Sequence, residues 1–301
     1  MVVERLSITV GVDGSVESLT AAHWAAGEAE LRHLSLRIVL AINEPVPGHS
    51  DYVFPPPVIA ANRTVNRARL DRAASSVLDS HPDLDVRTSL ECADPGRALV
   101  TASTDTALTV VGTRGRGRLA EVLVGSVALH VAAHAHGPVA VVPPVIDPSA
   151  DGGDRPILLG VDAGPSGTAA MGYAFEEAAV RRTRLQAALV LGDDGPWLAD
   201  EGRPPRRPGF DQALGLLSGQ LAPWEQKYPG LAVEQIVHRG RPAPGLLECL
   251  HHGPDRDRPS LIVVGSRRRG GLRGLLLGST GHQLIARATV PVVVVPPETG
   301  D

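Results

Sequence analysis

The chain of 301 residues is poor in aromatic residues, cysteine and lysine. Aromatic side chains make up 3% of it, which leaves few of the stacking platforms that single-stranded nucleic acids require. A formal net charge of -4 also argues against a general nucleic-acid binder. The two cysteines, Cys92 and Cys249, form neither a metal-binding spacing nor a disulfide framework, so we expect two buried or partly buried free thiols.

Long apolar runs are also missing. No segment reaches the length of a membrane span, and Glu4, Arg5 and Asp13 come too early for a secretory signal peptide. We therefore expect a cytoplasmic protein with no membrane or nucleic-acid partner. Hydrophobic residues at 43% and charged residues at 21% are typical of a globular chain, and the length predicts two domains.

What the chain does contain is an internal repeat. Residues 108–143 align without a gap with residues 261–296, and Gly112 and Gly125 are among the identical positions. The opening strands of the two halves also correspond. An internal repeat of this length predicts two tandem modules.

We place the modules at residues 1–146 and 154–298, on either side of the polar linker Asp147–Arg155. In each module, short β-branched runs alternate with helical patterns, which predicts an α/β fold with a five-stranded parallel sheet and helices on both faces. The predicted strands are Ile8–Val12, Leu36–Ile42, Leu84–Glu91, Leu108–Val111 and Val139–Val142, then Ile157–Val161, Leu185–Leu191, Ala232–His238, Leu261–Val264 and Val292–Val295. The predicted helices include Val58–Leu78, Gly96–Ser103 and Asp211–Lys227.

A glycine- and arginine-rich loop, Gly112–Arg118, follows the fourth predicted strand, and a helix is predicted to begin near Gly125 and Ser126. Glycines let backbone N–H groups approach an anion closely. A helix start adds unpaired N–H donors and the positive end of the helix dipole. This layout predicts a phosphate cradle. The alternative is a tight connection whose arginines form a solvated rim.

A P-loop lysine cannot meet the phosphate charge here. The chain has no GxxxxGK[ST] loop, and its one lysine, Lys227, lies far from the motif in the sequence. Backbone N–H groups, a divalent ion or arginines would have to do so. Arg114, Arg116 and Arg118 are placed for that role.

The run Gly112-x2-Gly115-x9-Gly125-Ser126, with an aspartate ending the first strand, resembles the nucleotide-binding motif of the universal stress protein family. The opening Gly11–Ser15 and the closing Pro138–Val142 are similar to that family too, and the resemblance covers the whole chain as two tandem modules. It implies flavodoxin-like, Rossmann-related modules that bind ligands beyond the carboxyl ends of the strands, where the strand order reverses.

The resemblance also implies ATP as the ligand. In module one it places Asp13 beside the adenine and ribose, Ala41 in apolar contact, and the motif glycines close to the ribose and phosphates. Gly125 and Ser126 would donate to the phosphates. The residues that it assigns to the nucleotide are Val12, Asp13, Ala41, Gly112, Arg114, Gly115, Gly125, Ser126 and Val127.

Module two departs from this motif at its second glycine, where Arg268 stands. It also has Ala163-Gly164 in place of Gly14-Ser15. A side chain at 268 can block the ligand, or its guanidinium can grip a phosphate. Two nucleotides per chain would show that Arg268 is tolerated, and one would indicate a degenerate second site. The residues assigned in module two are Asp162, Gly265, Arg267, Arg268, Gly278, Ser279 and Thr280.

Other chemistry-bearing residues give weaker signals. His130 and His134 are one helical turn apart and His136 follows, but no nearby carboxylate or cysteine completes a metal-binding set. Ordinary helix-terminal histidines are the preferred interpretation. The chain contains no GxSxG signature.

The sequence therefore predicts an ATP-binding stress-response protein with little or no turnover, whose nucleotide occupancy switches partner interactions. One alternative is a slow ATPase or nucleotidyl transferase with Mg²⁺ near Asp13 and Ser126. Another is a nucleotide-free interaction scaffold. The family resemblance also implies that the two modules pair through Val139–Val142 and Val292–Val295, with a homodimer as a further option.

Overall fold

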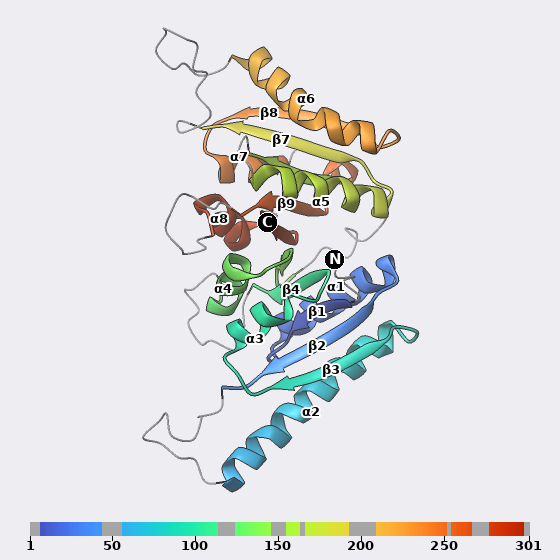
Figure 1. Cartoon of the computed structure of the whole chain (residues 1–301), viewed down its shortest axis with the longest axis vertical. Coiled ribbons are helices and arrows are strands. Elements are labelled where there is room, and N and C mark those ends of the chain that lie inside the picture. Colours follow the sequence, from blue (N-terminus) through green and yellow to red (C-terminus); the bar gives the residue numbers. More distant parts are fainter. Residues whose placement is uncertain are drawn as a thin grey trace. The chain divides into compact units, whose positions relative to one another are not determined.

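The computed structural model describes residues 7–43, 56–113, 124–145, 155–162, 166–192, 209–251, 254–266 and 277–297. The chain forms two compact units, Met1–Val145 and Ile146–Asp301. Figure 1 shows strands with helices packed against them in each unit.

Unit 1 is built on five parallel strands in the order β3-β2-β1-β4-β5. The central strand β1 pairs with β2 on one side and β4 on the other, so that Val10 lies opposite both Ile38 and Val110. The strands are β1 (Ser7–Gly11), β2 (Ser35–Ala41), β3 (Val86–Glu91), β4 (Leu108–Gly112) and β5 (Val139–Val142).

The helices of unit 1 connect these strands in chain order and cover both faces of the sheet. They are α1 (Val16–Arg32), α2 (Pro56–Ser80), α3 (Pro95–Ala102) and α4 (Ser126–His134). Helices α1 and α2 contact each other, as do α3 and α4. The path moves outward from β1 to β3 and then returns to β4 and β5. Right-handed crossovers therefore place α1 and α2 on one face and α3 and α4 on the other.

Unit 2 repeats this topology with the strand order β8-β7-β6-β9-β10, again all parallel. Its strands are β6 (Ile157–Val161), β7 (Leu185–Leu191), β8 (Val233–Arg239), β9 (Leu261–Gly265) and β10 (Val292–Val295). Its helices are α5 (Ser166–Arg181), α6 (Phe210–Lys227), α7 (Pro242–Cys249) and α8 (Ser279–Arg287), with a short 3₁₀ turn at Asp255–Asp257. The predicted α/β fold with two tandem modules is confirmed.

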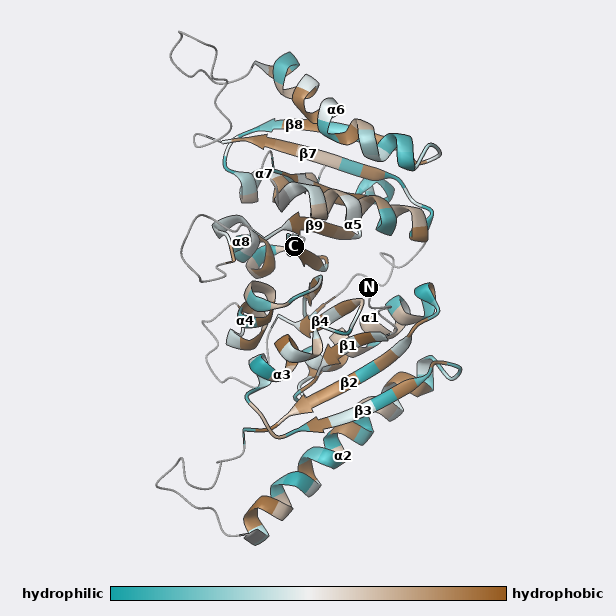
Figure 2. Cartoon of the chain, viewed as in Figure 1, coloured by the Kyte–Doolittle hydropathy of each residue, from teal (hydrophilic) through white to brown (hydrophobic). Residues whose placement is uncertain are grey.

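The core of each unit lies between the sheet and its helices. In Figure 2 the strands carry most of the hydrophobic colour. In unit 1, Ile8 and Val10 are fully buried, as are Ala21 and Ala25 of α1. These small side chains let α1 lie close to the strands. No described helix is long and apolar enough to cross a membrane.

Two packing features recur at equivalent positions in the units. A glycine near the carboxyl end of the central strand, β1 or β6, leaves room for a leucine of the short helix that packs there. A Cβ on Gly11 would lie 2.6 Å from Leu99, and a Cβ on Gly160 would lie 2.9 Å from Leu246. A short helix, α3 or α7, can therefore pack directly on β1 or β6.

The second recurring feature is a buried ion pair on the first helix of each unit. Glu28 pairs with Arg32 on α1, and Glu177 pairs with Arg181 on α5, one helical turn apart in both cases. Both glutamates are almost fully buried. Burying a carboxylate is costly unless it is paired, so each arginine offsets the cost that its glutamate would otherwise carry.

The expectation that both cysteine thiols are at least partly buried is confirmed for one and wrong for the other. Cys249 is half-buried and donates its thiol to the carbonyl of Gly245, and burial raises its pKa. Cys92 is exposed, because it follows β3, the outer strand of unit 1, at its carboxyl end.

Candidate functional site

The switch point of unit 1 lies between β1 and β4. The chain leaves β1 toward β2 and returns from β3 to β4, so the connections after β1 and β4 diverge to opposite faces of the sheet. Ligands of such sheets bind outside the carboxyl ends of the strands at this crevice. The residues that follow β1 and β4 are Val12-Asp13 and Thr113, and all of them are described.

Asp13 follows β1 in a turn that fixes its carboxylate. Its Oδ1 accepts hydrogen bonds from the backbone N–H of Ser15 at 2.9 Å and from the hydroxyl of Ser15 at 2.6 Å. The turn requires a left-handed residue, which Gly14 supplies at φ 81°. Val12 precedes the turn and donates its N–H to the carbonyl of Val39, so β1 remains tied to β2 at this point.

The turn also begins helix α1. Ser15 is the N-cap, and its hydroxyl oxygen accepts from the N–H of Ser18 at 3.2 Å. The hydroxyl of Ser18 donates back to the carbonyl of Ser15 at 2.9 Å. Asp13, Ser15 and Ser18 thus form a hydrogen-bond ladder that links the end of β1 to the first turn of α1. We call these three residues the Asp13 ladder.

Strand β4 ends at Gly112, and the next residue brings helix α4 to the same place. Thr113 donates its N–H to the carbonyl of Val142, and its own carbonyl accepts from the N–H of Gly125 at 2.7 Å. The start of α4 therefore lies directly beside the end of β4. The Thr113 hydroxyl oxygen is buried and has no hydrogen-bond partner among the described residues.

Helix α4 has an N-terminus without a side-chain cap. Gly125 is the N-cap, in an extended conformation, and within the described residues there is no side-chain cap hydrogen bond. Ser126 is exposed and Val127 is half-buried. The first N–H groups of a helix have no partner within the helix, and with the dipole they favour an anion. These amides fit a phosphate group, and Thr113, whose buried hydroxyl has no partner among the described residues, is hydrogen-bonded through its carbonyl to Gly125.

The remaining module-one candidates lie around this point or outside the described residues. Ala41 ends β2 and is half-buried, opposite Glu91 of β3. Since Val39 lies opposite Gly11, the end of β2 is adjacent to the end of β1. Arg114 and Gly115 lie outside the described residues, so their predicted role stays a prediction.

Unit 2 places the equivalent residues at the ends of β6 and β9. Gly265 ends β9, and Ser266 donates its N–H to the carbonyl of Val295. Gly278 is the N-cap of α8, again with no side-chain cap, and Ser279 and Thr280 form its first turn. Asp162 follows β6 directly. Arg267 and Arg268 lie outside the described residues.

The first turn of α5 lies close to the residue that follows β6. A Cβ on Gly167 of α5 would lie 2.3 Å from the carbonyl oxygen of Asp162. The aligned residue in unit 1 is Ser18, whose side chain is part of the Asp13 ladder. Helix α5 can approach Asp162 this closely only because glycine stands at 167, and a serine-based ladder has no room there.

Sequence reasoning missed Thr113 and the roles of Ser15 and Ser18. The spacing D-x-S-x-x-S after an apolar strand is a usable signal, because an aspartate often accepts from the backbone two residues later and serine is a preferred N-cap. Thr113 gave no such signal, since only the structure shows that its hydroxyl is buried without a partner.

The histidines of α4 pack on each other. The rings of His130 and His134 are stacked with centroids 4.4 Å apart, and His130 lies against Gly96 of α3. Among the described residues there is no group of three or more histidines, cysteines or acidic residues that could hold a metal ion.

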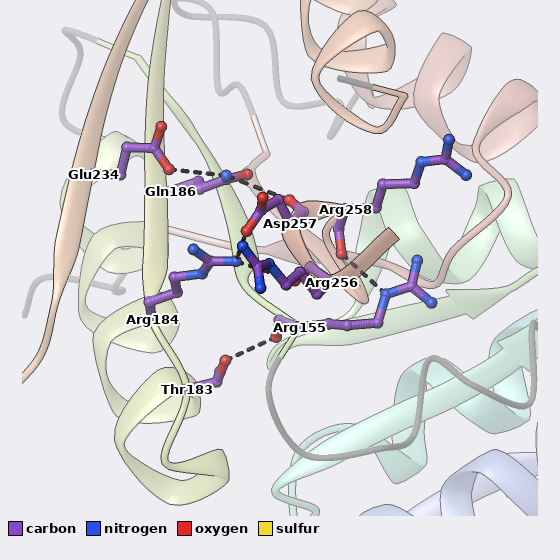
Figure 3. A network of polar contacts seen from close by, with 8 residues as sticks. All are labelled: Arg155, Thr183, Arg184, Gln186, Glu234, Arg256, Asp257 and Arg258. Carbon is purple, nitrogen blue, oxygen red and sulfur yellow. Dashed lines mark hydrogen bonds and ion pairs between the residues drawn. The ribbon is translucent and has the colours of Figure 1, made fainter. Parts of the chain in front are cut away.

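A polar network at the amino ends of the unit 2 strands is separate from the candidate site (Figure 3). Arg184 pairs with Asp257 and donates to the carbonyl of Arg256. Gln186 donates to Glu234 at 2.9 Å. Figure 3 also shows Arg155 donating to the carbonyl of Arg258, at 3.0 Å. These contacts hold the 3₁₀ turn against β6 and β7, at the opposite end of the strands from Asp162.

Comparison with known proteins agrees with this architecture. The family model described as "Universal stress protein family" matches residues 5–143 and 154–296. A universal stress protein of Mycolicibacterium smegmatis is 34% identical over 297 residues, covering 96% of this chain and 97% of its own length. One from Mycobacterium tuberculosis is 33% identical over 301 residues and covers 96% of each chain. The crystal structure of a universal stress protein from Archaeoglobus fulgidus has a TM-score of 0.71 at 18% identity, covering 98% of this chain and 99% of that one.

Proposed function

Because this chain belongs to the universal stress protein family, we propose that it is a cytoplasmic stress-response protein that binds ATP in module one and changes its partner interactions with nucleotide occupancy. The observation that carries the proposal is the convergence of three features at the switch point of unit 1. These are the fixed carboxylate of Asp13, the end of β4 at Gly112 and the uncapped start of α4 at Gly125.

Each feature suits a different part of an adenine nucleotide. A fixed carboxylate accepts hydrogen bonds from ribose hydroxyls or from the adenine amino group. A glycine at a strand end lets the ligand approach the backbone. The first-turn amides of α4, with the Ser126 hydroxyl, suit phosphate oxygens. In the slow-ATPase alternative, a Mg²⁺ ion near Asp13 and Ser126 would instead accompany the phosphates and neutralise part of their charge.

We propose a second, weaker site in module two. Gly265, Gly278, Ser279 and Thr280 supply the same backbone layout at β9 and α8. What differs is the environment of Asp162, which lies against Gly167 rather than within a serine ladder. Gly164 and Gly167 stand where the Asp13 ladder has Ser15 and Ser18, so module two lacks those two hydroxyls, and we expect a lower affinity there.

Nucleotide occupancy would act on partner binding through the loops of the site and the pairing of the two modules. We propose that β5 and β10 pair the two modules with each other, and that a homodimer is a further arrangement. A ligand shifts such an arrangement only if it binds one state more tightly than the other. Partner binding should therefore differ between nucleotide-loaded and nucleotide-free protein.

Calorimetric titration of nucleotide-free protein with Mg-ATP tests the proposal. We expect binding with at least one site per chain and no phosphate release above background in a parallel assay. Phosphate release that disappears in Gly125→Val would favour the slow-ATPase alternative. No heat of binding, together with no nucleotide in freshly purified protein, would overturn the proposal and leave the scaffold alternative.

A further inference from the structure

Helix α4 carries two histidines one turn apart on the same side. His130 is exposed and His134 is half-buried. Their rings stack with centroids 4.4 Å apart. Side chains at positions i and i+4 of a helix lie one above the other, and two histidines in this arrangement can reach the same metal ion. Neither residue belongs to the proposed nucleotide site.

The hydrogen bond of His134 determines which of its ring nitrogens is available. Nδ1 of His134 lies 2.8 Å from the carbonyl oxygen of His130. A carbonyl can only accept, so Nδ1 carries the proton and the neutral ring keeps its lone pair on Nε2. Histidines that bind metals usually make such a hydrogen bond with the other ring nitrogen, because it fixes the tautomer and orients the ring. His134 therefore has the arrangement of a metal ligand that binds through Nε2.

Helix α3 provides the surface on which His130 lies, and Figure 1 shows α3 and α4 side by side. A Cβ on Gly96 would come within 2.7 Å of Cδ2 of His130, so the ring occupies the space that a side chain at position 96 would take. The same Cβ would lie 3.3 Å from Oδ1 of Asp94, the N-cap of α3. A carboxylate thus lies near the ring, and its negative charge favours a cation there.

The second unit has neither histidine. Positions 130 and 134 align with Gln283 and Arg287 of α8. The amide of Gln283 donates to the carbonyl of Ser279 at 3.3 Å, and Arg287 is exposed. A guanidinium has no lone pair to offer, and an amide suits transition metals less well than an imidazole does. The two helices therefore have the same place in the fold and differ in this chemistry.

We propose that His130 and His134 bind one divalent transition-metal ion, Zn²⁺ or Cu²⁺, through their Nε2 atoms. Imidazole nitrogen suits these ions, whereas Mg²⁺ and Ca²⁺ prefer oxygen ligands. Water completes the coordination, because two protein ligands leave the other positions open. The proposal does not depend on nucleotide binding.

One ring must turn when the ion binds. The ring planes are inclined by 24°, so the two lone pairs lie in nearly parallel planes and do not meet at one point. The exposed ring of His130 can turn about its Cβ–Cγ bond, a torsion with a broad minimum, and both Nε2 atoms then point at one ion. Because the two histidines are one turn apart only while α4 is folded, the bound ion stabilises the folded chain and raises its thermal midpoint.

Calorimetric titration of the full-length chain, without a histidine tag, with Zn²⁺ and with Cu²⁺ tests the proposal. His130→Gln and His134→Arg give α4 the residues of α8, and each should weaken the binding of one ion about a hundredfold. His282→Gln removes an exposed histidine of α8 and should bind like the unaltered chain. Cu²⁺ should bind more tightly than Zn²⁺, and Mg²⁺ titrations should not differ between the unaltered chain and the variants.

Imidazole ¹H–¹⁵N spectra locate the ion. Before metal is added, His134 should carry its proton on Nδ1 and none on Nε2. Zn²⁺ should then shift Nε2 of His130 and of His134 together, and should raise the thermal midpoint of the unaltered chain but not that of His130→Gln. Equal thermal midpoints of the metal-free variants and the unaltered chain show that the fold is retained.

The proposal is overturned if Zn²⁺ and Cu²⁺ bind both variants as tightly as the unaltered chain. Weaker binding in only one of the two variants would assign the ion to a single histidine and would also overturn it. The same holds if Zn²⁺ shifts other histidines and leaves His130 and His134 unchanged.

Discussion

The two units share a fold and differ just beyond the central strand and between the first two helices. Both keep the glycine–leucine contact on the central strand and the buried glutamate–arginine pair on the first helix. Beyond that strand, unit 1 has the Asp13 ladder, and in unit 2 Gly167 lies close to the carbonyl oxygen of Asp162. The strand and helix layout therefore persists while the residue beside the aspartate changes from serine to glycine.

The contact between the first two helices has diverged as well. In unit 1 it is polar, because His23 of α1 contacts the hydroxyl of Ser76 at 2.9 Å. Beside it, His81 pairs with Glu30 of α1 at 2.8 Å. In unit 2 the residue aligned with His23 is Gly172, and it lies against the ring of Trp224. One unit thus joins these helices by titratable groups and the other by aromatic packing.

The largest expected effect comes from the aromatic contact of unit 2. Phe175 is fully buried, with its ring centroid 6.1 Å from Trp224 and 5.9 Å from Tyr228. Phe175→Ala should lower the free energy of unfolding of unit 2 by about 3–5 kcal/mol, through lost burial and the cavity left behind. Denaturant unfolding measures this. Phe175→Leu, which keeps most of the volume, is the control, and equal costs for the two variants would contradict the packing account.

Next in size is the loss of the Asp13 carboxylate. Hydrogen bonds to charged groups contribute about 1.5–3 kcal/mol, so Asp13→Ala should weaken ATP binding about tenfold to a hundredfold. Asp162→Ala is the matched variant in module two and should have a smaller effect on the tight site. Calorimetric titration of both variants with ATP measures the two effects. A larger loss of affinity in Asp162→Ala than in Asp13→Ala would reverse the ranking of the two sites.

A smaller effect is expected from the residue that positions Asp13. Ser15→Gly removes the hydroxyl donor to Asp13 but costs only a few tenths of a kcal/mol as an N-cap. We expect ATP affinity to fall by up to about tenfold, with little change in thermal stability. In an Asp13→Ala background the same substitution should have no further effect on affinity. An equal loss in both backgrounds would mean that Ser15 does not act through Asp13.

The smallest effect is a pH dependence of stability that the polar helix contact gives to unit 1. Burial and the neighbouring His81 lower the pKa of His23 below its ordinary value of 6.5. The unfolded chain therefore binds this proton first as the pH falls. The stability of unit 1 should be fully present above about pH 6.5 and decrease as the pH drops through the folded pKa of His23. His23→Gln should flatten this dependence.

Thermal unfolding at several pH values between about 5 and 8 measures the effect. The groups that face His23 are Ser76 and Ser80 of α2, with the His81–Glu30 pair nearby. His282→Gln on the exposed side of α8 is the control and should leave the pH dependence unchanged. A slope that His23→Gln does not alter would assign it to other groups.

The sequence predicted the fold well because most strands are short apolar runs with a clear end. The predicted Val139–Val142, Ile157–Val161, Leu185–Leu191 and Val292–Val295 coincide with β5, β6, β7 and β10. The other predicted strand and helix boundaries differ from the observed ones by at most two residues. Leu84 was predicted as the start of a strand that begins at Val86, because Leu84 is buried in the preceding turn rather than paired in the sheet.

The side-chain contacts of the site could not be predicted in the same way. The motif predicted a helix start at Gly125, but only the structure shows that the N–H of Gly125 donates a hydrogen bond to the carbonyl of Thr113. The His23–Ser76 contact joins residues 53 positions apart, and no local pattern marks it. The contact of Gly167 with Asp162 depends on how closely one helix approaches one turn, which periodicity does not encode.

The most direct test of the account is to count adenine nucleotides released on denaturing Gly125→Asp and Gly278→Asp proteins. A carboxylate at either N-cap would accept from the first-turn amides and exclude phosphate, while it supports the helix. The account predicts that Gly125→Asp loses its tightly bound nucleotide and keeps its thermal stability, and that Gly278→Asp retains it. Retention in Gly125→Asp with loss in Gly278→Asp, or no nucleotide in the unaltered protein even after incubation with Mg-ATP, would contradict the account.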